Sequence, residues 1–241
     1  MSDYDTSGSQ GGATGQTTGG SIERTLAGQA DLDLSDVLRE AWEKSAGVRS
    51  IVLISGVVMV LIAMFVSGIF GLMFGYADQT FVESLILQCL NSAATYPLVA
   101  GIFMVCLAHS VGRSVDLNMA FGFYSLFVPL AIIGIIQSAL TAIGMLLLVL
   151  PGLYLALALS LAIPLKVERD LPIGDCLMMS LKLVNAKFVN VLLIALMGVV
   201  AMALGFITLI GWIWTVPWTA MMFAITYRQL AGVRGEGSVA G

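Results

Sequence analysis

The sequence predicts an all-α fold, a polytopic transmembrane helical bundle of about six spans with amphipathic helices at the cytoplasmic interface. Two observations lead to this prediction. Hydrophobic residues make up 59% of the 241 residues and charged residues only 11%, whereas an ordinary soluble domain carries about 25% charged residues. Long apolar runs also follow one another from residue 50 onward, and most approach the roughly 20 residues that a spanning helix needs. Such a chain has too little polar surface for a soluble globule.

The fourth of the six apolar runs is the least regular. It reaches spanning length only if the helix begins at a turn formed by Pro151-Gly152 and if Lys166 extends its ammonium group to the interface. Pro151-Gly152 and Ile210-Gly211 leave room for only tight turns, which predicts antiparallel hairpins for spans three and four and for spans five and six. The runs lie near Ser50–Gly75, Ser84–His109, Phe127–Leu150, Leu153–Leu165, Val189–Thr208 and Trp212–Gln229.

The membrane domain, residues 33–231, is predicted to lie between two polar tails. Residues 1–32 are rich in Gly, Ser and Thr, and a segment with so few apolar groups cannot offset the entropy of ordering, so we expect a disordered cytoplasmic tail. Its first 20 residues lack the basic and apolar regions of a signal peptide. Residues 232–241 are expected to form a short flexible tail.

Two segments, at about 34–47 and 172–185, have the periodicity of amphipathic helices. In the first, Asp33 or Ser35 can cap the opening turn and Gly47 is expected to end the helix. The segment is too short and too polar to span, so we expect it in the cytoplasmic interface with Trp42 at the depth of the headgroups. Docking onto a partner is the alternative. A weaker copy of the pattern starts at Asp116, which suggests three repeated units of an interfacial helix feeding a hairpin.

The distribution of basic residues predicts the orientation. Every Lys and Arg lies before the first span, after the second, after the fourth, or at or beyond the end of the sixth. The connections near Tyr76–Phe81, Pro151–Gly152 and Ile210–Gly211 contain none. Because basic residues are retained on the cytoplasmic side, we expect a multi-pass protein of the cell inner (cytoplasmic) membrane with the N- and C-termini both cytoplasmic.

Three tryptophans at the start of the last span are typical of an aromatic belt. Trp212, Trp214 and Trp218 would lie at the outer membrane interface, where indole rings are common. A cation-binding aromatic cage is the sharper alternative, but no acidic residue accompanies the three rings.

Uncharged polar residues on spans two and three are the candidates for a functional site. No Asp, Glu, Lys or Arg lies inside a predicted span away from its ends, which argues against a proton-coupled pump but not against a passive pore. The polar side chains either line a cavity or join helices by hydrogen bonds, and we favour helix contact. The candidates are Gln88, Asn91, Gln137, Ser138 and Thr141, accompanied by Ser92 and Ser160.

The sequence contains no recognisable chemistry. Cys89, Cys106 and Cys176 have neither metal-ligand nor redox spacing, and the only histidine, His109, has no partner for a metal site or a triad. We therefore predict no catalytic residue, no cofactor, no metal and no enzyme activity. The net charge of −4 offers no global basic surface for nucleic acid. The predicted partners are the lipid bilayer and other membrane proteins.

Several short motifs resemble a known group of proteins. Pro151-Gly152-Leu153-Tyr154 opens a span, Ala162-Ile163-Pro164 runs into Val167-Glu168, and a helix with Leu177 and Ser180 leads to Asn185-Ala186-Lys187-Phe188. With Glu40-Ala41-Trp42 at the end of the early amphipathic helix, this pattern resembles the DUF975-like family of six-span bacterial membrane proteins. It also resembles the membrane domain attached to some glycerophosphodiester phosphodiesterases. The resemblance covers about residues 34–231 and implies a fold and a location. It carries over no activity, because the sequence has no soluble domain for phosphodiester hydrolysis.

Two functions follow as hypotheses. The first is an integral inner-membrane protein of structural or accessory type. The alternative is a transporter or channel for a small or lipid-like solute, using the region of Gln88, Asn91, Gln137 and Ser138. A continuous polar cavity between spans two and three would favour transport, and a dry, closely packed interface would favour the accessory role.

Overall fold

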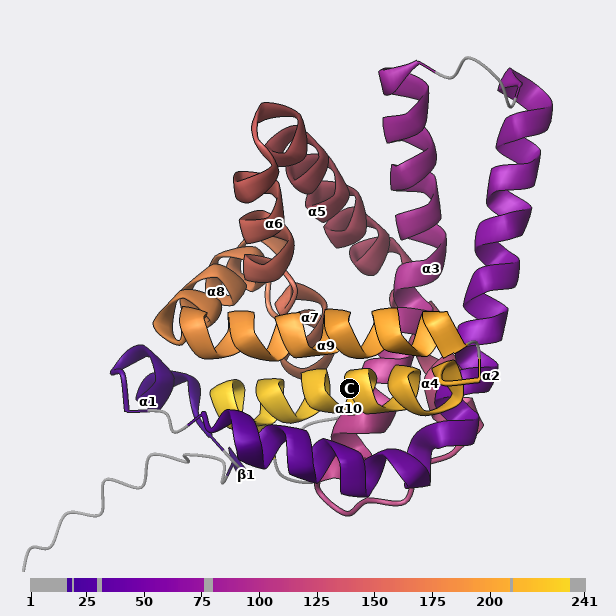
Figure 1. The fold of residues 1–241 in the computed structure, drawn as a ribbon. Helices are drawn as coiled ribbons and strands as arrows, with labels where there is room; N and C mark the ends of the chain where they lie inside the picture. Colours follow the sequence, from indigo (N-terminus) through magenta and orange to yellow (C-terminus); the bar gives the residue numbers. More distant parts are fainter. Residues whose placement is uncertain (1–16, 19, 30–31, 76–79, 209, 235–241) are drawn as a thin grey trace, which may run out of the picture.

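The computed structural model describes residues 17–18, 20–29, 32–75, 80–208 and 210–234, and it confirms the all-α class. Within these residues the only strands are β1 (Thr17–Thr18) and β2 (Val233–Arg234), which pair antiparallel. The helices form hairpins of unequal regularity around a shared core (Figure 1).

The first hairpin joins α2 (Leu34–Phe74) to α3 (Phe81–Ser110). The carboxylate of Asp33 caps α2, as predicted, by accepting a hydrogen bond of 2.7 Å from the amide of Ser35. The expectation that Gly47 ends the helix is wrong, because α2 continues without interruption into the first span. Figure 1 shows α2 running along the lower edge of the molecule and then turning upward.

Gly47 has a packing role instead. A Cβ atom at this position would lie 2.4 Å from Nε2 of His109 on α3. Glycine inside a helix costs about 1 kcal/mol relative to alanine, and here it allows α3 to approach α2 closely. The expected interfacial helix at 34–47 is therefore the first part of a longer helix.

The second hairpin is formed by α5 (Phe127–Leu147) and α6 (Val149–Ala158). The antiparallel pair was predicted, but its turn is at Leu148, with φ −160° and ψ 143°, and not at Pro151-Gly152. Proline is tolerated in the first turn of a helix, where its missing N–H has no intrahelical partner. Gly152 faces α5, since a Cβ on Gly144 would lie 2.9 Å from the Cα of Gly152.

Short helices precede and follow this hairpin. Before it come α4 (Leu117–Phe121), capped by Asp116, and the 3₁₀ helix η1 (Gly122–Leu126). After it come α7 (Ala162–Arg169) and α8 (Ile173–Ala186). Helix α8 covers nearly the same residues as the helix predicted at 172–185.

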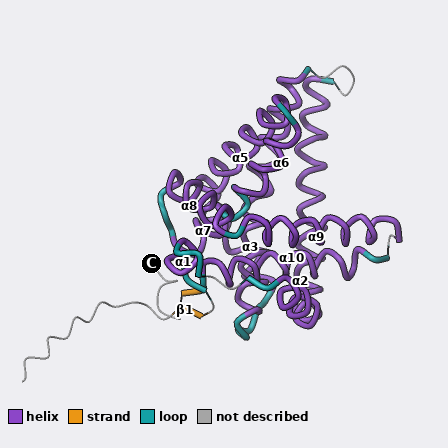
Figure 2. Tube along the Cα trace, turned by 60° about the vertical axis from the view of Figure 1, so that its left-hand side comes forward, coloured by secondary structure: helices purple, strands orange, loops and turns teal. Residues whose placement is uncertain are grey.

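The last hairpin consists of α9 (Phe188–Thr208) and α10 (Trp212–Ala231), with the turn at Ile210-Gly211 as predicted. Together with the first part of α2, these helices run across the direction of α3 and of the upper part of α2 (Figures 1 and 2). Helix α10 packs on α2, α3 and α9. It therefore lies at the centre of the molecule.

By length and composition, the structure accounts for five of the six predicted spans. In the described part of the chain, five helices or helix pairs are long and apolar enough to cross a membrane. Helix α10, the sixth predicted span, is not among them, and protein covers much of its second half: Met221, Ile225 and Tyr227 are fully buried. A helix enclosed by protein can carry polar residues that lipid would not tolerate. The five segments are Leu34–Phe74, Phe81–Ser110, Leu117–Leu147, Val149–Arg169 and Phe188–Thr208.

The tryptophans of α10 contact α2. The indole N–H of Trp218 donates to the carbonyl oxygen of Leu38 at 3.2 Å, and its ring meets that of Trp42 edge to face at 5.7 Å. The guanidinium of Arg49 lies 5.5 Å from the ring centroid of Trp214. Because Trp42 and Trp218 touch, they cannot lie at opposite membrane interfaces. The sequence placed Trp218 at the outer interface and Trp42 at the inner one, so these two expectations cannot both be right.

Part of the expected N-terminal tail is ordered. Helix α1 (Ile22–Leu26) lies against the end of α10, where the hydroxyl of Thr25 donates to the carbonyl oxygen of Leu230 at 2.6 Å. Both Ile22 and Thr25 are buried. These contacts and the β1–β2 pairing correct the expectation for residues 17–18, 20–29, 32 and 232–234. The expected tails at residues 1–16 and 235–241 lie outside the described residues.

Candidate functional site: an interrupted helix beside a polar cavity

The segment Val149–Arg169 contains a break between α6 and α7. Leu159, Ser160 and Leu161 form a turn, so the helical hydrogen-bond pattern is interrupted there. Pro164 adds to the interruption because its missing N–H cannot bond the carbonyl oxygen four residues earlier. In a membrane, backbone groups released in this way must find partners inside the protein.

Side chains from two other helices supply those partners. The hydroxyl of Ser180 on α8 accepts from the amide of Leu161 at 3.1 Å and donates to the carbonyl oxygen of Ala158 at 2.7 Å. The amide nitrogen of Gln137 on α5 donates to the carbonyl oxygen of Leu159. Ser180 and Gln137 are both buried. The break is thus a stable, satisfied structure held from both sides.

Ser180 was missed as a site residue from the sequence alone, although the resemblance included it. On α8 it is buried together with Cys176, Leu183 and Val184, at the i, i+4, i+7 and i+8 spacing of one helical face. A single hydroxyl on an otherwise apolar face was the signal. Burial raises the pKa of the neighbouring Cys176 thiol to about 11, so that thiol stays neutral and serves as a small apolar group.

A cavity of about 480 Å³ opens beside the break. Amides and hydroxyls from three segments face it: Gln88 from α3, Gln137 with Ser138 and Thr141 from α5, and Ser160 from the break. No charged side chain of the described residues lines this space. Its walls are completed by Tyr96, Val99, Ala142, Ala156, Leu159, Ile163 and Phe223.

Four of the five predicted site residues meet at this cavity, and Asn91 does not. The side-chain nitrogen of Asn91 donates instead to the hydroxyl of Ser67 on α2 at 3.3 Å and to the carbonyl oxygen of Leu87 at 3.2 Å. It therefore joins the two helices of the first hairpin. Gln88 and Asn91, three positions apart on α3, therefore face different neighbouring segments.

Some of the side chains that line the cavity make hydrogen bonds within the protein, and others make none to a described residue. The hydroxyls of Ser138 and Ser92 share a hydrogen bond of 2.6 Å between α5 and α3. The side chains of Gln88 and Thr141 make no hydrogen bond to any described residue, so they can bond an occupant. Tyr96 covers Gly134 of α5, where a Cβ would lie 2.4 Å from its ring. This glycine lets the tyrosine ring form a wall of the cavity.

Charged side chains gather at one end of the molecule, away from this cavity. Glu40 of α2 binds Lys44 at 2.7 Å and Arg228 of α10 at 2.6 Å. Both cations also donate to the carbonyl oxygen of Ser110 at the end of α3. These contacts join α2, α3 and α10.

A second charged group lies on α7. Buried Glu168 accepts a hydrogen bond from the hydroxyl of Tyr227, and Arg169 lies 3.4 Å from the same carboxylate. Arg169 also donates to the carbonyl oxygen of Ala231. Just beyond α7, Lys166 binds Asp170 at 2.7 Å, and this contact lowers the pKa of that exposed carboxyl group.

Metal-binding chemistry is not supported in the part of the chain that the structure describes. No group of three or more His, Cys, Asp or Glu side chains is placed to hold a metal ion there. The chain is an all-α integral membrane protein with a cavity that is lined in part by amides and hydroxyls. No protein-family model, no curated protein and no solved structure matches the chain. The resemblance to the DUF975-like family stays a prediction.

Proposed function

We propose that the protein is a transporter or channel for a small, uncharged or lipid-like solute, which it binds in the polar cavity between α3, α5 and α6. The observation that carries the proposal is this cavity of about 480 Å³, lined by Gln88, Gln137, Ser138 and Thr141. Ligand sites typically measure about 300–1,000 Å³ and combine mostly apolar walls with a few polar groups. The cavity has both properties.

The interrupted helix supports the same proposal. Membrane transporters commonly build their binding sites from broken helices near the middle of the bilayer, where unwound backbone lines a cavity. Here Leu159 and Ser160 lie at the break and also line the cavity. A break can adjust its shape at lower cost than a continuous helix, because fewer regular backbone hydrogen bonds must change.

The chemistry of the lining selects an uncharged solute. A charged group buried without a partner in a membrane costs several kcal/mol, and the cavity lining offers no opposite charge. It offers hydroxyl and amide groups, which donate and accept hydrogen bonds. We propose no catalytic role for these lining groups, because we assign amides and hydroxyls to the binding of a solute.

We place the protein in the cell inner membrane with both termini cytoplasmic. The basic side chains of Lys44, Arg169, Lys187 and Arg228 support this orientation, because they bind backbone carbonyls near the paired chain ends. Such a concentration of basic residues is typical of the cytoplasmic side.

A structural or accessory role remains the second candidate. The direct bond of 2.6 Å between Ser92 and Ser138 favours it, because this contact joins α3 and α5 closely at one level. Hydrogen bonds of this kind stabilise helix pairs in membranes. The cavity beside that contact is the reason for preferring transport.

A thiol-labelling experiment tests the proposal. In a variant with its native cysteines replaced, Thr141→Cys should react quickly with a charged, water-soluble methanethiosulfonate in proteoliposomes, because its side chain faces a hydrated cavity. Leu140→Cys, whose native side chain is exposed on the outer surface of α5, is the matched control and should react slowly. Equal rates at the two positions would contradict a water-accessible site.

A further inference from the structure

We infer that the occupant of the site is a single-chain amphiphile with an uncharged, hydroxyl-bearing head group, and that its chain passes Phe223 into a second, apolar pocket. The inference rests on the proposed function and assigns the class of its solute. Phe223 lines the polar cavity, an apolar pocket of about 290 Å³ and a smaller space of about 180 Å³. Its side chain thus lies between regions of opposite polarity.

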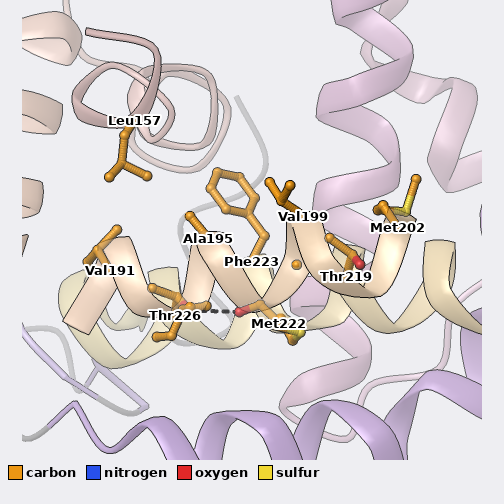
Figure 3. A pocket seen from close by; sticks show the side chains of 11 residues that line it. Leu157, Val191, Ala195, Val199, Met202, Thr219, Met222, Phe223 and Thr226 are labelled. Carbon is orange, nitrogen blue, oxygen red and sulfur yellow. Dashed lines mark hydrogen bonds between the residues drawn. The ribbon is translucent and has the colours of Figure 1, made fainter. Parts of the chain in front are cut away.

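The apolar pocket is built from α9, α10 and one residue of α6. Figure 3 shows the ring of Phe223 pointing from α10 toward the side of the pocket where Leu157 lies. The opposite wall includes Ala195, Val199 and Met202 of α9. Val199 is among the exposed apolar residues of this helix, so the pocket borders the surface that faces lipid. An acyl chain can enter there without crossing water.

The smaller space adjoins the polar cavity and shares one lining residue, Phe223, with the apolar pocket. Val99, Ser160 and Ile163 line both this space and the polar cavity, and Phe223 lines all three. Phe223 is held by Phe103 of α3, with ring centroids 5.6 Å apart and planes at 72°. An occupant that reached both regions would therefore have to pass Phe223.

The polarity on each side of Phe223 determines which end of an amphiphile lies where. The head group belongs with Gln88 and Thr141, whose side chains make no hydrogen bond to another described residue. The chain belongs among the aliphatic side chains of α9, where each buried methylene contributes about 0.8 kcal/mol. A charged head group would lack a counter-ion. A free polar solute would leave the apolar pocket without a role.

Binding of monooleoylglycerol to the full chain in phosphatidylcholine nanodiscs tests the inference, with monobutyrin as the short-chain comparison. Ala195→Phe fills the apolar pocket and should weaken monooleoylglycerol binding about tenfold, by displacing about two methylenes, while monobutyrin binding stays unchanged. Leu196→Phe is the matched control, because Leu196 is exposed on the same helix and lines neither pocket. It should change neither affinity.

Thr141→Val separates this inference from the proposed function. Loss of one hydrogen bond to the head group should weaken both ligands about fivefold. If Thr141→Val weakens binding but Ala195→Phe leaves monooleoylglycerol unaffected, the two-part site is wrong and the polar site stands. If monobutyrin binds and monooleoylglycerol does not, the two-part site is likewise wrong and the polar site stands. If neither ligand binds in a way that depends on Thr141, the inference and the proposed site both fail.

Discussion

The two hairpins that point upward in Figure 1 differ in almost every structural detail. The α2–α3 hairpin consists of continuous helices, and α3 begins with a capping box in which Thr80 and Glu83 satisfy each other's backbone and side-chain groups. The α5–α6 hairpin turns at a single leucine, Leu148, and its return helix breaks after 10 residues. Both hairpins contribute to the polar cavity, the first through α3 and the second through α5 and α6.

The apices of the hairpins also differ in polarity. The α5–α6 apex is apolar from Ile143 to Leu153, and Leu148 and Leu150 are 68% and 79% exposed. At the α2–α3 apex, polar Thr80 and Glu83 are accompanied by exposed apolar side chains such as Leu72 and Val82. Exposed apolar side chains are suited to contact with hydrocarbon, whereas polar groups are suited to water. The irregular hairpin thus supplies a helix break and several polar lining groups that the regular hairpin lacks.

The largest expected effect comes from placing a charge at the apolar apex. Leu148→Asp should destabilise the protein by about 3 kcal/mol, the cost of an acidic residue deep in a bilayer. Val82→Asp, at an exposed position of the first hairpin beside the polar turn, should cost little. Unfolding in lipid bicelles measures both. Equal tolerance would mean that the second apex reaches water, as the sequence predicts for an outer turn.

Removal of the Ser180 hydroxyl should have the next largest effect. Ser180→Ala leaves the amide of Leu161 and the carbonyl oxygen of Ala158 without their partner at the break, which should cost about 2 kcal/mol. Met178→Ala, at an exposed position on the same helix, is the control. Denaturant titration of the purified protein provides the measurement. A similar small loss in both variants would show that the break is held by other contacts.

Gln137→Leu should destabilise the protein by about 1 kcal/mol, since one hydrogen bond to the carbonyl oxygen of Leu159 is lost. Gln88→Leu also removes an amide from the cavity, but it breaks no hydrogen bond to a described residue. We expect its unfolding midpoint to match that of the unmodified protein. If the two variants were equally destabilised, cavity polarity and not the break would explain the effect.

The smallest effect is expected in the regular hairpin. Thr80→Ala removes the cap of α3 and should cost about 0.5 kcal/mol, at the low end for a solvent-exposed N-cap. Ser84→Ala, one turn later, leaves the capping box intact and should be neutral. Thermal unfolding compares the pair. A loss for Thr80→Ala as large as that for Ser180→Ala would contradict the distinction between the two hairpins.

Helix positions were largely predictable, and helix interruptions were not. Three features follow from residues that are neighbours in the sequence: the N-cap at Asp33, the helix at 172–185 and the turn at Ile210-Gly211. The roles of Gly47 and Gly152 did not follow, because glycine is equally suited to a turn and to a close helix crossing. The role of Gly47 depends on His109 of α3, and the role of Gly152 depends on Gly144 of α5.

The candidate site was predicted in composition but not in geometry. Gln137, Ser138 and Thr141 stand out in sequence because polar residues are rare inside spans. Asn91 stands out equally, yet its side chain leaves the cavity aside and binds Ser67 of α2. The direction in which each side chain points depends on the rotation of its helix against its neighbours, which one chain segment does not specify.

The sequence by itself determined the membrane class, the helical content and the location of polar groups along the chain, because apolar content and periodicity are local properties. The tertiary structure alone decided that α10 is enclosed by protein, that the fourth span is interrupted, and that Ser180 and Gln137 hold the interruption. Those features depend on which released backbone group meets which side chain in space. Hydrogen bonds reach only about 3 Å, so they form only after packing has brought distant segments together.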